Sequence, residues 1–208
     1  MDTKEFQNPI TNSLLNTGLS ILDDILPLEV ANQINEAFNN TTEWTIQNQQ
    51  EKTHYSTEHK SENIFLPQSK ECYYAKFSES YTLKTNPLIK DIFYKYFIPL
   101  LQQVSPYTIN SIDYRCYKLD KGDHYRSHID DFLGSINLIY YASKEWRWDW
   151  GGILNINSHT DQELCYPILP KFNRLVLLNN KIFRSPHHVS SVEHFALNPR
   201  YSIVSFNK

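Results

Sequence analysis

Glycine, cysteine and long apolar runs are all scarce in this chain, and each shortage excludes a class of protein. Only 5 of the 208 residues are glycine, which argues against flexible linkers. No stretch has the length of a membrane span or the apolar core of a signal peptide. The three cysteines, Cys72, Cys116 and Cys165, are odd in number and far apart, so we expect reduced thiols and no disulfide framework. These absences predict a cytoplasmic protein that makes no membrane contact.

The chain also lacks an excess of charge of one sign. Its 20 Lys and Arg residues stand against 23 Asp and Glu residues, for a net charge of -3, and no block of basic residues occurs. A nucleic-acid binder normally carries a concentrated positive face. We therefore expect no nucleic-acid partner. The sequence does not indicate an oligomeric state.

Two helical patterns occur in the N-terminal half. Apolar residues recur at helical spacing in Leu28–Phe38, and Pro27 suits a first helical position. The second pattern, Asn86–Leu101, begins with an Asn cap followed by proline and carries two adjacent apolar stripes. Pro99 lies inside this pattern and should end or kink the helix.

The segment between the two helical patterns is predominantly polar. Residues 39–63 are rich in Asn, Thr, Gln, Glu, Lys and Ser, which indicates a long loop. Ile64–Pro67 and Cys72–Phe77 predict short strands after this loop.

The C-terminal half consists of short apolar or alternating runs separated by turn residues. Many short strands with regular turn signals are typical of a sandwich or a jelly roll. We expect a mainly β (α+β) fold with one domain, 1–208, in which a helical part to about residue 106 supports a catalytic core from about 107 to 208. The predicted strands of this core are Ile109–Leu119, Ser135–Ala142, Gly152–Ile156, Arg174–Leu178, His187–Val192 and Arg200–Phe206.

The most informative stretch is His128-Ile-Asp130. In a strand, side chains two residues apart point to the same face, so this imidazole and this carboxylate can converge. A second imidazole would complete the two-His-one-carboxylate arrangement that leaves positions open on iron(II). Taken alone the tripeptide is weak evidence, because exposed His-x-Asp pairs are common.

Three further features of the C-terminal half support such a site. The stretch Pro186–Val189 offers a second imidazole from one of two adjacent histidines, since neighbouring strand residues face opposite ways. Arg200 and Ser202 share one face of the last strand, where a guanidinium and a hydroxyl suit a carboxylate. The stretches Ile139–Tyr141 and Gly151–Leu154 read Ile-Tyr-Tyr and Gly-Gly-Ile-Leu.

In order, spacing and flanking residues, these features resemble the prolyl 4-hydroxylase-like branch of the Fe(II)/2-oxoglutarate-dependent oxygenases. The resemblance extends from about Tyr114 to Phe206. The family shows a His-x-Asp after a Tyr-rich strand, then Tyr-Tyr, Gly-Gly-x-Leu, Pro-His-x-Val and Arg-x-Ser. This resemblance implies a double-stranded β-helix (jelly-roll) core with flanking N-terminal helices. It also implies Fe(II), 2-oxoglutarate as cosubstrate and O2, with ascorbate as a candidate reductant.

Carried over to this chain, the resemblance implies that His128, Asp130 and His187 are the iron ligands and the catalytic centre. His188 is the alternative to His187. The resemblance favours His187, because the family's ligand follows proline and precedes x-Val.

The resemblance also implies the cosubstrate-binding residues. Arg200 would bind the distal carboxylate of 2-oxoglutarate, aided by Tyr141 and Ser202, with Tyr117 as a weaker candidate. Arg200 lies 13 residues after the histidine ligand, more than in the common family pattern, which predicts a longer turn through Glu193–Pro199.

The function implied is hydroxylation of an unactivated C–H bond in an amino acid, a peptide or a small natural product. Oxidative decarboxylation of 2-oxoglutarate to succinate and CO2 would accompany it. A peptidyl-prolyl hydroxylase is the alternative within this class.

Two alternatives come from other classes. One is a non-catalytic jelly-roll module that binds carbohydrate through Trp146, Trp148 and Trp150. The other is a metalloenzyme on a similar barrel that uses no keto-acid. Arg200 separates these readings, because only a keto-acid enzyme needs it.

Overall fold

The computed structural model describes residues 9–50, 73–105, 107–109, 112–128, 136–157, 165–182 and 186–207. Its strands are β1 (Leu19–Leu22), β2 (Thr45–Gln50), β3 (Tyr73–Glu79), β4 (Ile112–Leu119), β5 (His124–His128), β6 (Ile136–Tyr141), β7 (Leu154–Asn157), β8 (Cys165–Ile168), β9 (Arg174–Asn179), β10 (His187–Val189) and β11 (Arg200–Asn207). Its helices are α1 (Pro9–Asn16), α2 (Leu28–Asn40), α3 (Tyr81–Thr85), α4 (Pro87–Ile92) and α5 (Ile98–Val104), with a π-helical segment at Phe93–Phe97 and a 3-10 turn at Trp148–Trp150.

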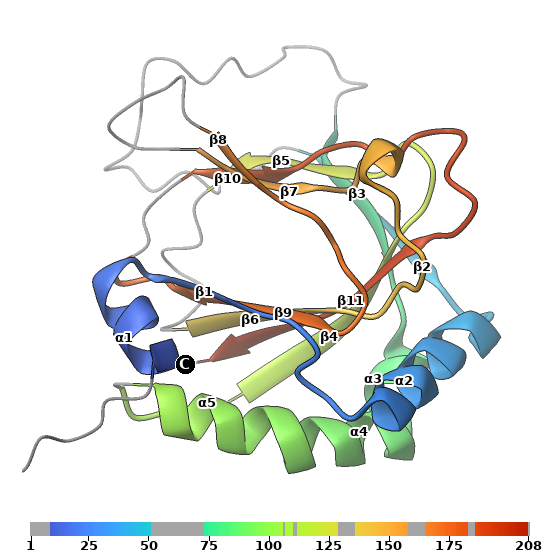
Figure 1. Cartoon of the computed structure of the whole chain (residues 1–208). Helices are drawn as coiled ribbons and strands as arrows, with labels where there is room; N and C mark the ends of the chain where they lie inside the picture. Colours follow the sequence, from blue (N-terminus) through green and yellow to red (C-terminus); the bar gives the residue numbers. More distant parts are fainter. Residues whose placement is uncertain are drawn as a thin grey trace, which may run out of the picture.

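The strands form one curled antiparallel sheet. Neighbouring strands pair in the order β1-β9-β6-β11-β4-β3-β5-β10-β7-β8, and β2 pairs with β3 beside this path. The sheet folds over so that β5, β7, β8 and β10 face β1, β4, β6, β9 and β11, while the long helices cover the outside of the second group (Figure 1). This is the double-stranded β-helix core that the sequence predicted.

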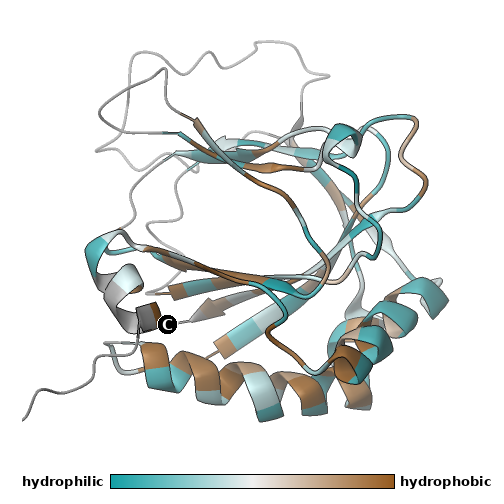
Figure 2. Cartoon of the chain, in the orientation of Figure 1, coloured by the Kyte–Doolittle hydropathy of each residue, from teal (hydrophilic) through white to brown (hydrophobic). Residues whose placement is uncertain are grey.

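Alternation along the strands divides the apolar core into two clusters. Tyr140 and Ile203 face the helices, where the Tyr140 ring lies 5.1 Å from the ring of Phe97. Tyr141 faces the inside of the curled sheet and belongs to a second cluster. Figure 2 shows bands of apolar residues along the helix that covers the sheet. The outer cluster stabilises the scaffold, and the inner face is left for the site.

The helix predicted at Asn86–Leu101 is confirmed at its start, but of the two outcomes expected at Pro99, an end or a kink, the end is wrong. The Asn86 side chain accepts the N–H groups of Leu88 and Ile89, and the helix then continues to Val104. The π-helical turns at Phe93–Phe97 lie immediately before Pro99. These wider turns change the hydrogen-bond pattern where proline lacks an N–H, so the chain stays helical.

The expectation of a loop over residues 39–63 is wrong for residues 45–50. This polar stretch forms β2, which pairs along β3 from Thr45 opposite Glu79. Backbone pairing with a neighbouring strand outweighs the weak β preference of these side chains. Residues 51–72, which include the predicted strand Ile64–Pro67, lie outside the described residues.

The N-terminal part combines the expected helices with strands, and the strand predicted at Cys72–Phe77 is confirmed as β3 over its described residues. Strands β1 and β3 enter the main sheet, with Leu19 of β1 opposite Leu178 of β9. Helix α1 and strands β1 and β8 were not predicted, because each is short and lacks a clear period. None of the helices in the described part of the chain combines the length and apolarity that crossing a membrane requires.

Candidate metal and cosubstrate site

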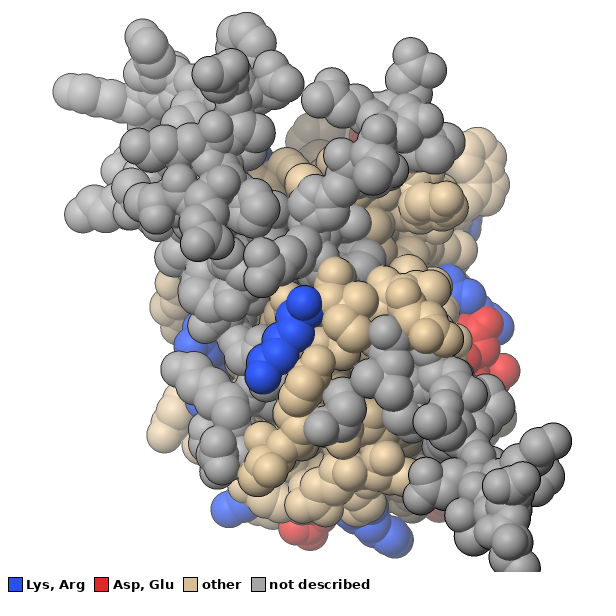
Figure 3. Space-filling view, turned by 90° about the vertical axis from the view of Figure 1, so that its left-hand side faces the viewer, with Lys and Arg blue, Asp and Glu red and all other residues tan. Residues whose placement is uncertain are grey.

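The two imidazoles predicted to bind iron lie opposite each other on adjacent strands. His128 ends β5 and His187 begins β10, and the two are paired in register. Their ring centroids are 4.4 Å apart, and His187 is only 4% exposed. Strands β8 and β10 begin at the left-hand side of Figure 1, which Figure 3 views directly. The fold therefore brings together two imidazoles that are distant in sequence.

A β-bulge turns His128 toward the inside of the sheet. His128 pairs with His187, whereas Tyr125 pairs with Val189, so β5 has one residue more than β10 over this interval. The extra residue allows Tyr125 and His128 to face inward together despite their odd spacing. The Tyr125 ring also stacks on Phe77 at 4.8 Å, which fixes this part of the strand.

A backbone hydrogen bond determines the tautomer of His128. Its Nδ1 lies 2.7 Å from the carbonyl oxygen of Arg126. A carbonyl can only accept, so Nδ1 carries a proton, and in the neutral ring Nε2 then keeps its lone pair. Metal-binding histidines are commonly oriented in this way. His128 is therefore prepared to offer Nε2 as a ligand.

The third predicted ligand, Asp130, lies outside the described residues. Within the described ranges no three His, Cys, Asp or Glu side chains form a metal-binding group. His188 lies opposite Asn155, one position along from His187, and so projects from the other face of the sheet. Burial and then the neighbouring His187 lower the pKa of His188. The arrangement brings His187, and not His188, opposite His128.

The turn before β5 is held by a buried carboxylate. Asp123 accepts the N–H of Asp120 at 2.8 Å and forms an ion pair of 3.3 Å with Lys76 of β3. Burial raises the pKa of Asp123, although its partners favour the charged form. These contacts fix the start of the strand that carries His128.

Arg200 is a buried cation on the inner face. It is 3% exposed, and its guanidinium lies over the Tyr141 ring at 4.8 Å. Among the described residues Arg200 forms no ion pair, and neither its Nε nor the Tyr141 hydroxyl has a hydrogen-bond partner. A buried charge without a counter-ion is costly. The site is thus suited to an anion that accepts hydrogen bonds, as the distal carboxylate of 2-oxoglutarate would.

The other predicted cosubstrate residues lie beside Arg200. In register, Ser202 stands between Tyr117 on one neighbouring strand and Tyr141 on the other, so all three share the inner face. Burial raises the pKa of both tyrosines, and the charge of Arg200 only partly offsets this for Tyr141. Both phenols therefore stay protonated and can donate hydrogen bonds.

The start of β11 is anchored on both sides of Arg200. The Ser143 hydroxyl donates to the Pro199 carbonyl at 2.9 Å and accepts the N–H of Tyr201 at 2.6 Å. The chain between β10 and β11 accommodates the extra residues as an irregular segment through Glu193–Pro199, as predicted. Arg200 consequently enters the inner face despite the longer turn.

Gly152 makes room for the Arg200 side chain. Its φ is +62°, and a Cβ at this position would lie 2.9 Å from Cδ of Arg200 and 3.2 Å from the Trp146 ring. The role of this glycine was not predicted, although a Gly-Gly pair in a chain with 5 glycines was a usable signal. Ser143 gave no comparable signal, because its contacts depend on the tertiary structure.

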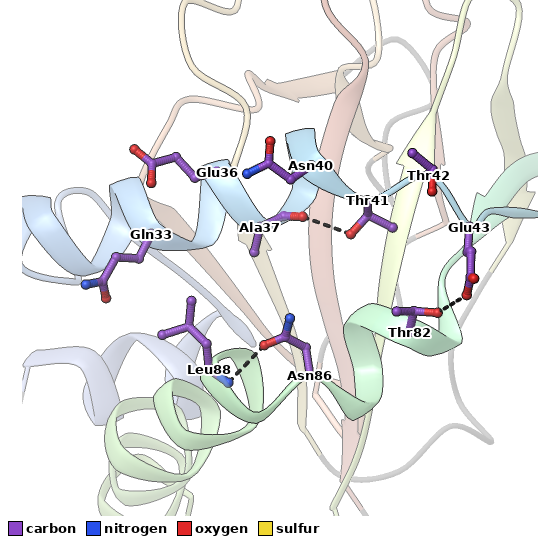
Figure 4. A pocket seen from close by; sticks show the side chains of 10 residues that line it. All are labelled: Gln33, Glu36, Ala37, Asn40, Thr41, Thr42, Glu43, Thr82, Asn86 and Leu88. Atoms are coloured by element: carbon purple, nitrogen blue, oxygen red, sulfur yellow. Dashed lines mark hydrogen bonds between the residues drawn. The ribbon is translucent and has the colours of Figure 1, made fainter.

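A separate pocket of about 530 Å³ lies among the helices on the outside of the sheet. Figure 4 shows its wall between α2 and α3–α4. Several of its polar groups serve local structure, since the Thr41 hydroxyl donates to the Ala37 carbonyl and Asn86 accepts from the N–H of Leu88. None of the predicted site residues lines this pocket.

Comparisons with known proteins agree with the double-stranded β-helix fold. Residues 112–208 match a sequence model of the 2OG-Fe(II) oxygenase superfamily. No curated protein sequence matches the chain.

Solved structures share the fold at low identity. A prolyl-4-hydroxylase from Pseudomonas putida has a TM-score of 0.69 at 14% identity, over 96% of each chain. A prolyl hydroxylase from Trichoplax adhaerens, in complex with a hypoxia inducible factor peptide fragment, has a TM-score of 0.67 at 18% identity, over 95% of this chain and 86% of that one. The non-heme α-ketoglutarate-dependent epimerase SnoN from nogalamycin biosynthesis has a TM-score of 0.61 at 8% identity, over 96% of this chain and 80% of that one.

Proposed function

We propose that this chain, a relative of the prolyl 4-hydroxylase-like 2OG-Fe(II) oxygenases, is an Fe(II)/2-oxoglutarate-dependent dioxygenase that hydroxylates a C–H bond. Its substrate would be an amino acid, a peptide or a small natural product. The iron ligands would be His128, Asp130 and His187.

The observation that carries this proposal is the buried Arg200, which forms no ion pair among the described residues. A guanidinium that is 3% exposed and forms no ion pair among the described residues requires an anionic partner. It lies on the inner face of the same curled sheet that holds the two facing imidazoles. A keto-acid that chelates a metal through one end and offers a carboxylate at the other fits both features.

The residues of the chain would have distinct roles in this reaction. His128 and His187 would each offer one nitrogen to the iron, and Asp130 a carboxylate. Arg200 would hold the distal carboxylate of 2-oxoglutarate, with Tyr141 donating a hydrogen bond from its protonated hydroxyl. The apolar inner cluster would exclude water from the reacting centre. When bound, iron and 2-oxoglutarate would together supply the oxidation of a C–H bond by O2, with release of succinate and CO2.

The metal site can be tested without a substrate. Under anaerobic conditions, Fe(II) and 2-oxoglutarate should give a weak visible charge-transfer band with the wild-type protein. His128→Ala and Asp130→Ala should abolish this band, because each removes one of three metal ligands. His188→Ala is the matched control and should retain it, since His188 projects from the opposite face. A band that survives in both ligand variants would refute the assignment.

The cosubstrate site needs a second measurement. Arg200→Ala should weaken 2-oxoglutarate binding at least about 100-fold, because a charge-assisted hydrogen-bonded pair is lost from a buried site. Arg147→Ala is the control, since Arg147 is exposed and, within the described part of the chain, its ion pair is with Asp149. Equal affinities in the two variants would favour a metalloenzyme that uses no keto-acid.

The carbohydrate-binding alternative is disfavoured by burial. Trp146 and Trp150 pack edge to face at 5.4 Å inside the protein, and the Trp146 indole N–H donates to the Gly151 carbonyl at 3.0 Å. Only Trp148 is exposed. The peptidyl-prolyl alternative gains support from the fold shared with two prolyl hydroxylases, of which one is in complex with a peptide.

A further inference from the structure

The Ser143 hydroxyl binds both peptide groups that adjoin the Cα of Arg200. It donates to the Pro199 carbonyl at 2.9 Å, which belongs to the peptide before Arg200. It accepts the Tyr201 N–H at 2.6 Å, which belongs to the peptide after Arg200. The orientation of these two planar peptides defines φ and ψ of Arg200, and hence the direction in which its side chain leaves the backbone. One buried hydroxyl therefore fixes the backbone of the proposed cosubstrate anchor.

This hydroxyl replaces a main-chain acceptor at the end of a strand. Beyond β6 the pairing with β11 continues to Ala142, whose N–H donates to the Tyr201 carbonyl at 3.0 Å. In an antiparallel pair of this kind, the Tyr201 N–H would ordinarily return a bond to the Ala142 carbonyl. That carbonyl instead accepts the side-chain amide of Asn35 in α2 at 2.8 Å. Because a hydroxyl can accept and donate at once, Ser143 both supplies the missing acceptor and holds the Pro199 carbonyl.

The same short segment carries the aromatic ring that lies against the guanidinium. Tyr141 stands two residues before Ser143, and its ring centroid lies 4.8 Å from Cζ of Arg200. Tyr141 thus contacts the far end of the arginine side chain, whereas Ser143 holds its backbone. Between these two points Gly152 leaves room for Cδ. The arginine is fixed at both ends by one stretch of chain.

A small backbone change at Arg200 is amplified along its side chain. A guanidinium lies about 6 Å from its own Cα, so a backbone rotation of about 10° moves it by about 1 Å. A displacement of this size in a positioned group can cost on the order of 100-fold. Without the hydroxyl, the Pro199 carbonyl and the Tyr201 N–H lose their shared partner, so both peptides can rotate. The Tyr141 ring still restrains the side chain, so a smaller loss is expected.

We propose that Ser143 is a positioning residue for 2-oxoglutarate, which fixes the backbone of Arg200 and so aims the guanidinium at the distal carboxylate of the cosubstrate. This inference rests on the proposed function and adds to it a residue that acts on the cosubstrate without contacting it. Ser143 acts through Arg200. Its effect is therefore confined to cosubstrate affinity and disappears when the guanidinium is absent.

The test measures the dissociation constant of 2-oxoglutarate from the anaerobic Fe(II) protein through the visible charge-transfer band. Ser143→Ala should weaken binding about 10-fold. The amplitude of the band at saturating 2-oxoglutarate should stay that of wild type, because the metal ligands are intact. Ser143→Thr keeps the hydroxyl and should stay within about threefold of wild type.

Ser80→Ala is the matched control for the loss of a buried serine hydroxyl. Ser80 is as deeply buried as Ser143, and its hydroxyl caps α3 by accepting the Leu83 N–H at 3.1 Å. Removal of this cap should lower the free energy of unfolding. The affinity for 2-oxoglutarate should be unchanged, since Ser80 makes no contact with the segment around Arg200.

A double-mutant cycle separates the positioning of Arg200 from a general loss of structure. On the Arg200→Ala background, Ser143→Ala should change the affinity for 2-oxoglutarate by less than about twofold, because the group that it positions is gone. A general loss of structure would lower the affinity by the same factor on both backgrounds. Thermal unfolding by circular dichroism shows whether each variant is folded at the titration temperature. If Ser143→Ala is not folded, Ser143→Cys takes its place, since a thiol fills the volume but forms only weak hydrogen bonds.

The outcomes distinguish this inference from the proposed function. If the wild-type protein gives no band with Fe(II) and 2-oxoglutarate, the proposed function itself fails. If the band forms but the Ser143 variant without a hydroxyl binds 2-oxoglutarate like wild type, the inference about Ser143 is overturned. It is also overturned if that variant loses the same factor on the Arg200→Ala background, or if Ser143→Thr loses as much affinity.

Discussion

Substitution of Gly152 by alanine should weaken 2-oxoglutarate binding, although none of the residues proposed to bind 2-oxoglutarate is replaced. The new Cβ would lie 2.9 Å from Cδ of Arg200, whereas carbon atoms in good contact are about 3.5–4.0 Å apart. Arg200 must therefore retreat by about 0.6 Å or more at Cδ, and its guanidinium lies further out along the same side chain. A displacement of about 1 Å in a positioned group can cost on the order of 100-fold. We expect a loss of 2-oxoglutarate affinity of at least about 10-fold.

Gly122 provides the matched control for backbone strain. It also has a positive φ, +84°, but a Cβ there would meet nothing within 4 Å. Alanine at either position costs about 1–2 kcal/mol for the left-handed conformation. Gly152→Ala should lose somewhat more stability, because the Cβ also crowds the Trp146 ring at 3.2 Å. Gly122→Ala should lose stability but bind 2-oxoglutarate normally.

In the first assay, 2-oxoglutarate is titrated into the anaerobic Fe(II) protein, and the visible charge-transfer band reports binding. In the second assay, urea unfolding of the same samples gives the free energy of unfolding. Thermal unfolding by circular dichroism establishes that each variant is folded at the titration temperature. The reasoning is refuted if Gly152→Ala is destabilised as expected yet binds 2-oxoglutarate like wild type. It is equally refuted if both glycine variants lose the same affinity, since strain alone would then explain the effect.

Two further predictions follow from buried and paired side chains. Tyr141→Phe should leave the free energy of unfolding unchanged or raise it by up to about 1 kcal/mol, because the buried hydroxyl has no partner among the described residues. The same variant should bind 2-oxoglutarate about 10-fold or more weakly than wild type. A loss of stability with unaltered binding would contradict this prediction. The hydrogen bond from Arg174 lowers the pKa of Asp23 to about 2, with Lys171 contributing, so this carboxylate stabilises the fold above about pH 4 and the contribution disappears as the pH falls toward 2. Because Asp23 is partly exposed, Asp23→Asn should lower the free energy of unfolding by only about 0.5–1 kcal/mol at pH 7. Urea unfolding of wild type and variant should show this difference at pH 7 and its loss at pH 2. A difference that is the same at both pH values would exclude the ion pair as its cause.

The fold class could be predicted from the sequence because it depends on short-range patterns, and the same kind of pattern selects the candidate site residues. Strand alternation, turn residues and the Asn86 cap act within a few residues of the chain. The ordered motifs around His128, Pro186 and Arg200 were enough to indicate the oxygenase resemblance. Prediction failed where long-range pairing decided the structure, as in β2, whose polar side chains gave no β signal.

The sequence by itself determined which residue types are available to the site: the histidines around positions 128 and 187, a late Arg-x-Ser and a glycine pair. Only the tertiary structure decided how they meet. The register between β5 and β10 places His187 rather than His188 opposite His128, and the bulge at Tyr125 turns His128 inward. Register and burial arise from contacts between strands that are distant in the chain, so no local pattern encodes them.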